Sequence, residues 1–519
     1  MQQGSLVSRA LTRQWSFFWA GIGFGIAQII YIVTLWYDAW GAGKDAKSTP
    51  ITVTTDLGRM FRAMELQSTH WVGMADWQLY GSSTDGIASG GAFTPGVGWA
   101  IVGMMLGGWF VALLEKESRS WVKYSTKMLW ISFIGGIVFS YGTRLAGGCT
   151  LNHLLGGLPM MNIHSLVTVA MMAMGGALAF LVMSKLNLAD NFKHQETKDY
   201  VVNADAGERS LYDPDYKPRQ RPIYWFSFLF LVLFFGIASY GGFFSPDNLE
   251  HLRKGNMEAF GKSVEAKGWF YVMGTLIAGI VGGFAMAKSG FGTECALVCA
   301  ETAQTMTKND AKFAAMRVPR ITRTLMRGYL PMIGVAAHWV LMLAVIWGAW
   351  VFFGIKPGFE DGIKEQLTAG SLIGGLLLGM GAVLLVGCEI RSYMRVGLGY
   401  LNTWVGLIGF AVGYLPFTLF LNEHEGFLKS TLMIKEFKVY QLITQDVAMQ
   451  QAILGGWMLL ILAMLIWLVR LGTRNTGTNR HAMLYKSTED LQRLIDTEAA
   501  KNGGRIGSVT APVPVPNPA

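Results

Sequence analysis

Two short stretches of the chain place a glycine–cysteine pair where a long apolar run ends. The first, Gly147 to Gly157, reads Gly-Gly-Cys-Thr-Leu-Asn-His-Leu-Leu-Gly-Gly, and the second, Val386 to Gly399, begins Val-Gly-Cys-Glu-Ile-Arg. A free thiol is a soft group with a weak S–H donor, and backbone N–H groups at a helix start favour an anion. These residues therefore predict reversible binding of a small, soft anion. A buried cysteine is also an ordinary small hydrophobe, but the repetition of the pair favours a site.

Charged side chains lie near both cysteines in the sequence. Arg144 lies five residues before the first cysteine, and Glu389 and Arg391 lie one and three residues after the second. Charges at membrane depth are costly and usually functional, so the arginines are candidates for attracting an anion, with anchoring of a helix end as the alternative. Glu389 is a candidate partner for an arginine or a candidate proton carrier. His153 is a candidate proton relay, with a structural hydrogen bond as the alternative.

A third stretch, from Ser289 to Ala300, brings glycines, Glu294, Cys295 and Cys299 to the end of another apolar run. The two cysteines would share one face of a helix. No second pair and no histidine cluster accompanies them, so we expect no metal. The sequence also has no phosphate-binding loop and no spacing typical of a nucleophile and its base, so we expect neither a cofactor nor an enzyme.

Composition places these stretches in a lipid bilayer. Of 519 residues, 52% are hydrophobic and 15% charged, and the basic residues behind the net charge of +9 form short clusters between apolar runs, which argues against nucleic acid. Apolar runs of about 20 residues, the length that crosses a bilayer, predict ten helices. These runs lie at about 14–37, 96–114, 127–146, 163–185, 223–243, 268–287, 328–354, 369–387, 397–421 and 452–471.

The ten runs form two sets of five, and a glycine–cysteine pair closes the third run of each set. Because five is odd, the second set would enter the membrane from the opposite side, as in an inverted repeat with its site near the midplane. The distribution of Lys and Arg between the loops places both termini in the cytoplasm. We therefore expect an all-α polytopic membrane protein of about ten transmembrane helices, in two inverted five-helix repeats with short re-entrant cysteine-bearing turns.

The expected organisation has four parts. Residues 1–13 form a cytoplasmic N-terminus, and residues 14–243 form the first membrane repeat, which includes an extracytoplasmic loop at 38–95. Residues 244–472 form the second membrane repeat. Residues 473–519 form a cytoplasmic tail, largely flexible because its end is rich in glycine and proline.

The run Gly142-Thr-Arg-Leu-Ala-Gly-Gly-Cys-Thr-Leu-Asn-His-Leu-Leu-Gly-Gly resembles the signature of the YeeE/YedE sulfur-transport family. Ser289-Gly-Phe-Gly-Thr-Glu-Cys-Ala and Val386-Gly-Cys are similar to its other two cysteine turns, and the likeness covers residues 14–472. The resemblance implies a bacterial inner-membrane protein that takes up thiosulfate along cysteine-bearing turns. It also implies that Cys149 and Cys388 are the central thiols and Cys295 an end station.

We thus expect an uptake transporter for thiosulfate or a related small sulfur-containing anion, embedded in the bilayer, with a cytoplasmic sulfur-carrier protein as a candidate partner. The candidate substrate-binding residues are Cys149, Cys388, Cys295, Gly148, Gly387, Thr150, His153, Arg144, Glu389 and Arg391. One alternative is a membrane anchor subunit for a redox or sulfur-handling partner, and another is a transporter of a selenium species. An anchor would seal the thiols in apolar packing, whereas a transporter needs access to them from both faces.

Overall fold

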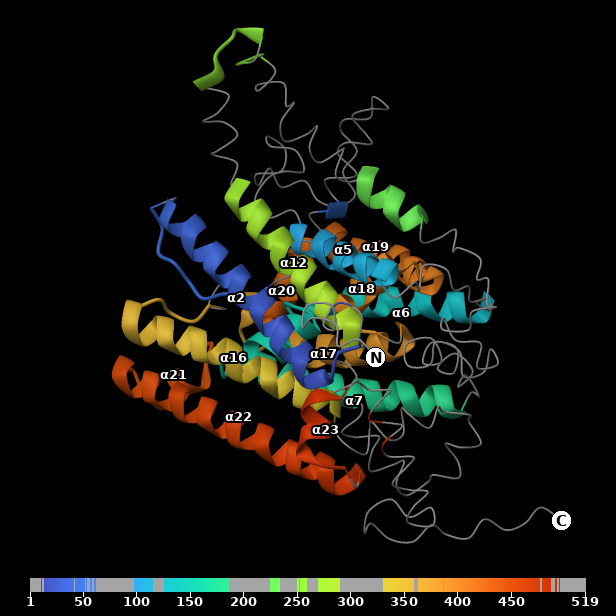
Figure 1. Ribbon diagram of the computed structural model, residues 1–519. Coiled ribbons are helices and arrows are strands. Elements are labelled where there is room, and N and C mark those ends of the chain that lie inside the picture. The colour runs from blue at the N-terminus through green and yellow to red at the C-terminus, as the bar shows by residue number, and fades with distance from the viewer. Residues whose placement is uncertain are drawn as a thin grey trace, which may run out of the picture.

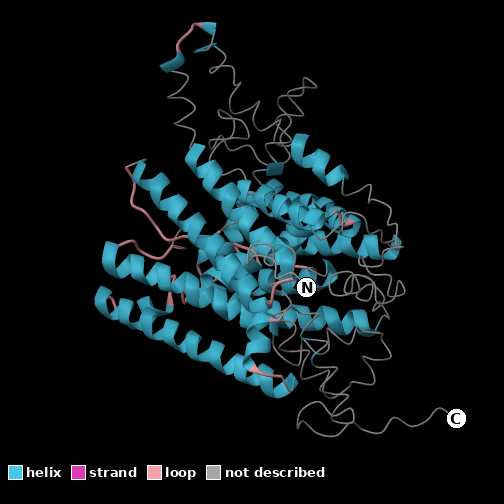
Figure 2. Ribbon diagram, in the orientation of Figure 1, coloured by secondary structure: helices cyan, strands magenta, loops and turns pink. Residues whose placement is uncertain are grey.

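The computed structural model describes the helical bundle and some of its connections, all of them helices, turns and loops (Figure 2). The described residues are 11, 14–41, 43–51, 53, 57, 60–61, 98–114, 126–185, 225–233, 250–251, 253–258, 269–289, 330–358, 363–385, 387–476, 478–486, 491 and 494. Six described helices are long and apolar enough to cross a membrane, and three shorter apolar helices accompany them. The expected all-helical membrane class is confirmed to this extent.

The helices begin and end close to the expected apolar runs. In the first half they are α2 (Phe17–Gly41), α5 (Trp99–Leu114), α6 (Thr126–Leu145), the π-helix η3 (Leu151–Gly157) and α7 (Ile163–Lys185). In the second half they are α12 (Trp269–Ser289), α16 (Leu330–Phe353), α17 (Ala369–Leu385), α18 (Glu389–Leu398), α19 (Leu401–Leu419), α20 (Leu421–Ser430), α21 (Val439–Ile443), α22 (Val447–Thr476) and α23 (Arg480–Tyr485). A 3₁₀ turn, η4 (Ile363–Glu365), precedes α17. The expected run at 223–243 is described only over 225–233, which is helical.

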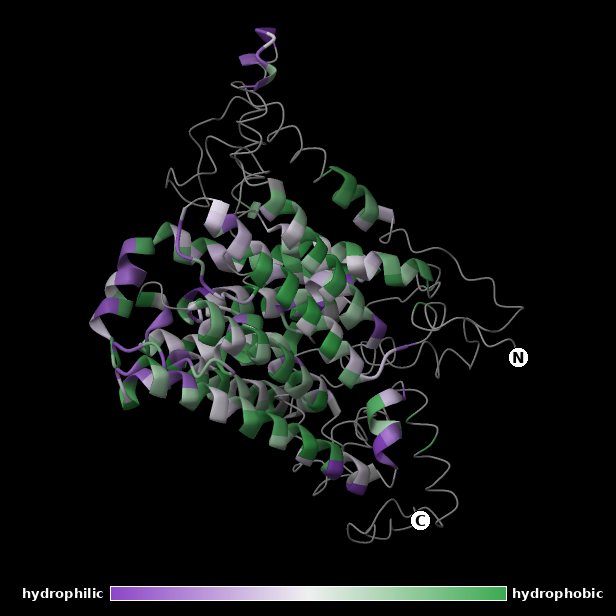
Figure 3. Ribbon diagram, turned by 60° about the vertical axis from the view of Figure 1, so that its left-hand side comes forward, coloured by the Kyte–Doolittle hydropathy of each residue, from purple (hydrophilic) through white to green (hydrophobic). Residues whose placement is uncertain are grey.

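The hydropathy of the bundle fits a bilayer environment. Figure 3 shows hydrophobic residues along the length of the helices and hydrophilic residues gathered at helix ends and in connecting loops. Many large apolar side chains face outward, including Leu459, Leu460 and Trp467 of α22. Exposed apolar faces of this extent are unfavourable in water and favourable against lipid. In Figure 1, α22 runs beside α16 along one outer edge of the bundle.

Glycine-lined faces join the first half of the chain to the second. α5 packs on α12, where Gly103 and Gly107 face Gly279 and Gly283, and a Cβ on any of the four would meet the backbone of the other helix. α6 packs on α19, and α7 packs on α17, through glycines in the same way. Helices in lipid associate through close van der Waals packing, which small residues permit. The two halves therefore form one interlocked bundle.

The loops at one end of the bundle are tied together by backbone hydrogen bonds. Ser48 N–H donates to Lys356 O at 2.9 Å, and Gly358 N–H donates to Ser48 O at 2.8 Å. An isolated β-bridge joins Asn162 to Lys438 in the α20–α22 connection, and Nζ of Lys438 donates to Pro357 O at 2.8 Å. The turn that follows η3 therefore lies at the same end as the connections after α2, α16 and α19.

At the opposite end, the segment before α2 contacts the end of α12 and the C-terminal helix α23. Trp15 N–H donates to Lys288 O at 2.8 Å, and the Ser16 hydroxyl donates to Leu484 O at 2.7 Å. The two sets of contacts separate the helix ends into two groups. This grouping fits helices that alternate in direction along the chain. The described residues near both termini lie at the same end of the bundle.

The connection after α2 folds back into the bundle. Ile51 N–H donates to the side-chain oxygen of Gln28, in the interior of α2, at 2.7 Å. Gln28, Ile51 and Val53 are fully buried, and Leu57 and Met60 are nearly so. The sequence predicted an extracytoplasmic loop over 38–95. Its first residues end α2 and are largely exposed, and its described part from Ser48 to Phe61 packs among the helices. Residues 62–97 lie outside the described residues.

Candidate functional site

The first glycine–cysteine turn forms where α6 ends. α6 stops at Leu145, and Gly147 has a φ of 73°, a left-handed conformation that costs a residue with a side chain about 1–2 kcal/mol. Cys149 follows, fully buried, with its Sγ 3.3 Å from Oδ1 of Asn152. The expected interruption of the apolar run is therefore present. The thiol lies at its centre, turned toward an amide side chain.

The π-helix η3 follows the turn, and α16 satisfies its free carbonyls. A short helix leaves its last carbonyls without partners inside the helix, and in lipid each must find one within the protein. The indole N–H of Trp339 donates to Leu154 O at 2.8 Å, and Nε2 of His338 lies 3.3 Å from Leu155 O. Side chains from the second half of the chain thus hold the re-entrant segment of the first half in place.

Two histidines stand beside the first turn, and both have polar partners. Nδ1 of His153 lies 3.1 Å from the Ser165 hydroxyl, and His164 is hydrogen-bonded to Asn162. Their rings meet edge to face at 4.9 Å. The other ring nitrogen of His153, Nε2, faces Gly148, at 3.1 Å from the position that a Cβ there would take. His153 therefore borders the turn through one nitrogen and is oriented through the other.

The second glycine–cysteine turn forms where α17 ends at Leu385. Cys388 has an extended backbone and caps the N-terminus of α18, and its thiol is fully buried. The sequence did not predict α18 as a helix, because Glu389, Arg391 and Arg395 give it a polar character. All ten of its residues are buried, and Gly399 ends it in a left-handed conformation with a φ of 82°. A charged half-helix thus lies inside the bundle.

The side chains of α18 fold back toward its own start. Nη1 of Arg395 lies 3.5 Å, and Oγ of Ser392 lies 3.6 Å, from the position that a Cβ on Gly387 would take. Glu389 accepts a hydrogen bond from the Tyr393 hydroxyl at 2.5 Å. Arg391, Arg395 and Glu389 are at most 3% exposed. The second turn is therefore surrounded by a guanidinium, a hydroxyl and a thiol.

The two turns are built alike. The glycine before the cysteine faces the residues four and five positions after it, which are Asn152 and His153 in the first turn and Arg391 and Ser392 in the second. Thr150 adds a hydroxyl beside Cys149; this hydroxyl is buried and has no partner among the described atoms. The first turn offers neutral donors, and the second offers cationic ones.

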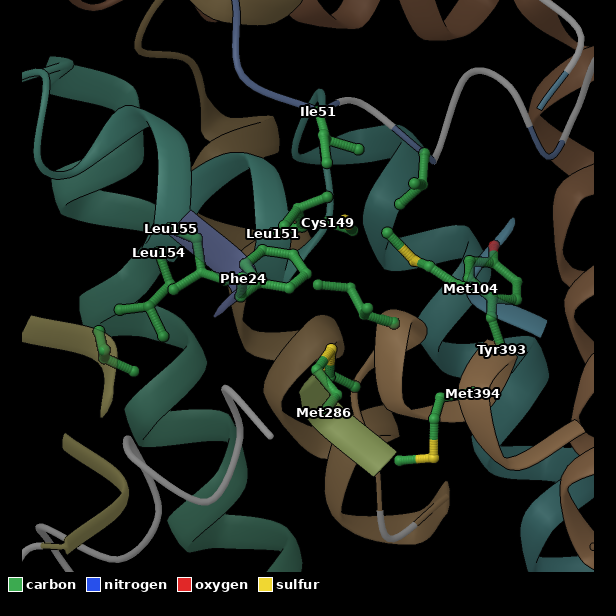
Figure 4. Packing of buried hydrophobic residues seen from close by; sticks show 14 of the residues in the cluster. Phe24, Ile51, Met104, Cys149, Leu151, Leu154, Leu155, Met286, Tyr393 and Met394 are labelled. Carbon is green, nitrogen blue, oxygen red and sulfur yellow. The ribbon is translucent and has the colours of Figure 1, made fainter. Parts of the chain in front are cut away.

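Figure 4 shows part of the packing around the first turn. Cys149, Leu151, Phe24 and Ile51 lie in one buried cluster, with the folded-back segment after α2 on one side of the thiol. Cys388 belongs to the same cluster. Neither thiol is exposed to solvent. Both thiols are therefore buried in the structure.

The remaining candidate residues lie apart from these turns or outside the described part. Arg144, in the last turn of α6, donates from Nη1 to the Tyr414 hydroxyl at 2.9 Å and stacks on that ring, with its Cζ 4.4 Å from the centroid. Its described polar contacts thus go to α19. Cys295, Cys299 and Glu294 fall outside the described residues, so their expected roles stay predictions.

Comparison with protein families decides the class of the chain. Residues 1–178 and 320–500, more than half of the sequence, match the family described as sulphur transport. The chain belongs to the YeeE/YedE sulphur transport family. Each matched region contains one glycine–cysteine turn, so the family pattern covers Cys149 and Cys388 separately. Neither the curated proteins nor the solved structures gave a match.

Membership of the sulphur transport family gives weight to residues that sequence reasoning missed. Ser392 and Arg395 face Gly387, and Asn152 contacts the first thiol. Asn152 and Ser392, four and five residues after a glycine, had a signal in the sequence, since residues one turn into a helix lie near its start; Arg395 lies two turns in and had none. His338 and Trp339 left no such signal, because they reach the site from another helix.

Proposed function

We propose that this member of the sulphur transport family is an uptake transporter for thiosulfate or a related small sulfur-containing anion. The observation that carries the proposal is the pair of buried glycine–cysteine turns, each set between an interrupted apolar helix and a short following helix. A soft thiol S–H and backbone N–H groups bind a sulfur-bearing anion without the tight hold of a fully cationic pocket. Transport requires this compromise between entry and release.

The helix contacts support two inverted repeats. If α2, α5, α6 and α7 correspond to α12, α16, α17 and α19, each contact has a counterpart: α2–α16 matches α12–α5, and α6–α19 matches α17–α7. The contact of η3 with α16 likewise matches that of α18 with α5. A two-fold axis that relates the two halves would exchange each contact with its counterpart in this way. It would bring the Cys149 turn from one face and the Cys388 turn from the other toward the middle.

In this mechanism the anion passes between the two turns. Cys149, with Gly148, Thr150 and His153, forms one station, and Cys388, with Gly387, Glu389 and Arg391, forms the other. Arg144 fixes the packing of α6 on α19, and Cys295 is an end station. The positive-inside rule favours cytoplasmic termini, and the family resemblance implies the bacterial inner membrane and transport of the anion inward.

A second candidate, a non-transporting anchor subunit for a redox or sulfur-handling partner, is favoured by the complete burial of both thiols. Apolar packing is what an anchor requires. Transport requires instead that the bundle open from this closed state. The polar and charged side chains around both turns favour transport, because an anchor has no use for costly charges at membrane depth.

The test is uptake of ³⁵S-labelled thiosulfate by cells that lack their own uptake routes, with membrane abundance measured for each variant. Cys149→Ala and Cys388→Ala remove the thiol, and Cys149→Ser and Cys388→Ser keep a small donor of harder character. We expect uptake by the intact protein, its loss in both alanine variants and weak uptake in the serine variants. Undiminished uptake in the alanine variants would exclude the thiols from the path. No uptake by an abundant intact protein would favour the anchor or a selenium substrate.

A further inference from the structure

We infer that the second turn is an oxyanion-binding station in which Ser392 and Arg395 hold the oxygen atoms of the substrate while Cys388 faces its sulfur. The inference rests on the proposed function and extends it to the chemical class of the substrate, a sulfur anion that carries oxygens. Neither residue was among those that the sequence predicted for the site. Their placement in the fold singles them out.

The first observation is the Ser392 hydroxyl. The residue is 4% exposed, and its side chain carries one hydroxyl oxygen, Oγ. This oxygen is turned toward the Gly387 turn, at 3.6 Å from a Cβ position there. A hydroxyl has one O–H donor that can rotate toward a ligand. A bound anion would accept a hydrogen bond from it.

The second observation is the Arg395 guanidinium. Although Arg395 lies at the far end of α18, its side chain returns along the helix, and its Nη1 lies 3.5 Å from the same Cβ position. The side chain is 1% exposed, and its Cζ lies 5.8 Å from the centroid of the Tyr400 ring. A guanidinium presents planar paired donors that match the spacing of two oxygens on one acid group. The first N–H groups of α18 point the same way.

The groups around this turn are therefore of two chemical kinds, hard donors and one soft thiol. The guanidinium, the hydroxyl and the helix N–H groups are hard donors that suit oxygen, and the thiol of Cys388 suits sulfur. Thiosulfate has both kinds of end: three oxygens on one sulfur and a second, terminal sulfur. The first turn has no described cation beside it. Its donors are neutral, so the second turn, with its guanidinium, is where the oxygens are held more strongly and where discrimination by the oxygens takes place.

The experiment measures the kinetics of ³⁵S-thiosulfate uptake into proteoliposomes, for the intact protein, Ser392→Ala and Arg395→Lys. Sulfate, which has the oxygens without a terminal sulfur, and hydrosulfide, which has sulfur without oxygens, serve as competitors. Hydrogen bonds to a charged group contribute about 1.5–3 kcal/mol, so each substitution should raise the KM about tenfold or more. Inhibition by sulfate should fall in both variants, and inhibition by hydrosulfide should be unchanged.

Ser132→Ala is the matched control, because that serine, on α6, is buried too but is not among the atoms nearest the Gly387 Cβ position. It should leave the KM and both inhibitions unchanged. Ser392→Ala removes only a hydroxyl, so it keeps the test decisive if Arg395→Lys folds poorly. An unchanged KM, or equal loss of both inhibitions, would overturn the oxyanion station while leaving transport established. An inert intact protein would instead overturn the proposed function and this inference with it.

Discussion

Trp339→Phe tests whether α16 holds the Cys149 turn closed. The substitution keeps an aromatic ring in α16 and removes the indole N–H that donates to Leu154 O at 2.8 Å. Leu154 is 1% exposed, so its carbonyl would be left without this donor in an apolar setting. The cost of such a group is about 1–3 kcal/mol. Because the bond joins η3 to α16, this cost falls on the closed state of the turn and not on a state in which η3 has moved away.

The population of the open state should therefore rise by about 5- to 150-fold, since about 1.4 kcal/mol corresponds to a factor of ten. The measurement is the rate at which a small maleimide modifies the thiol of Cys149, in a protein whose other three cysteines are alanine. When closing is fast compared with modification, this rate follows the open population. The rate in Trp339→Phe should increase by the same factor.

Trp347→Phe supplies the matched control for this prediction. Trp347 lies on the same helix and also donates its indole N–H to a backbone carbonyl, that of Gln451 at 2.9 Å, but this bond joins α16 to α22. The two substitutions therefore remove the same atoms and the same type of hydrogen bond. Equal modification rates in both variants would refute the view that the bond to Leu154 controls access to the thiol.

Two further predictions concern the elements around the site. Gln28→Met removes the acceptor of the Ile51 N–H group. A cysteine placed at Val53 should then react with a membrane-impermeant maleimide at least several times faster than in the protein that keeps Gln28. An unchanged rate would mean that other contacts hold the segment. Gly397→Ala would press a methyl group against the backbone of α5 and should cost about 1–3 kcal/mol of stability. This loss should appear as a lower unfolding temperature in detergent, whereas Gly456→Ala on α22, where nothing lies within 4 Å, should show no such loss.

The two turns differ in the charged side chains that lie beside them. Arg391 and Arg395 are buried beside the second turn, whereas the first turn is bordered by neutral amide and hydroxyl groups and by His153. In the proposed mechanism, an anion would therefore be attracted more strongly to the Cys388 station. Buried Glu389, beside Cys388, would offset part of this attraction. Partial compensation of this kind would keep an anion from being trapped in a site that it must leave.

Hydropathy and glycine placement predicted much of the fold. The apolar run at 163–185 corresponds to α7 residue for residue, and the run at 127–146 differs from α6 by one residue at each end. Such agreement is expected in a membrane, because the bilayer fixes the length of a spanning helix and demands internal backbone hydrogen bonds. The interruptions at Cys149 and Cys388 were predicted for the same reason.

The sequence by itself thus determined the membrane class, the positions of the helices, the two cysteine turns and the family. The tertiary structure alone decided which groups surround each thiol. Trp339 and His338 reach η3 from a helix more than 170 residues away, and Gln28 draws Ile51 into the interior. Ser392 and Arg395 became part of the site only because α18 is buried and directs them back to Gly387. Hydropathy is a property of each local stretch, whereas the partners of a buried polar atom depend on how distant stretches pack.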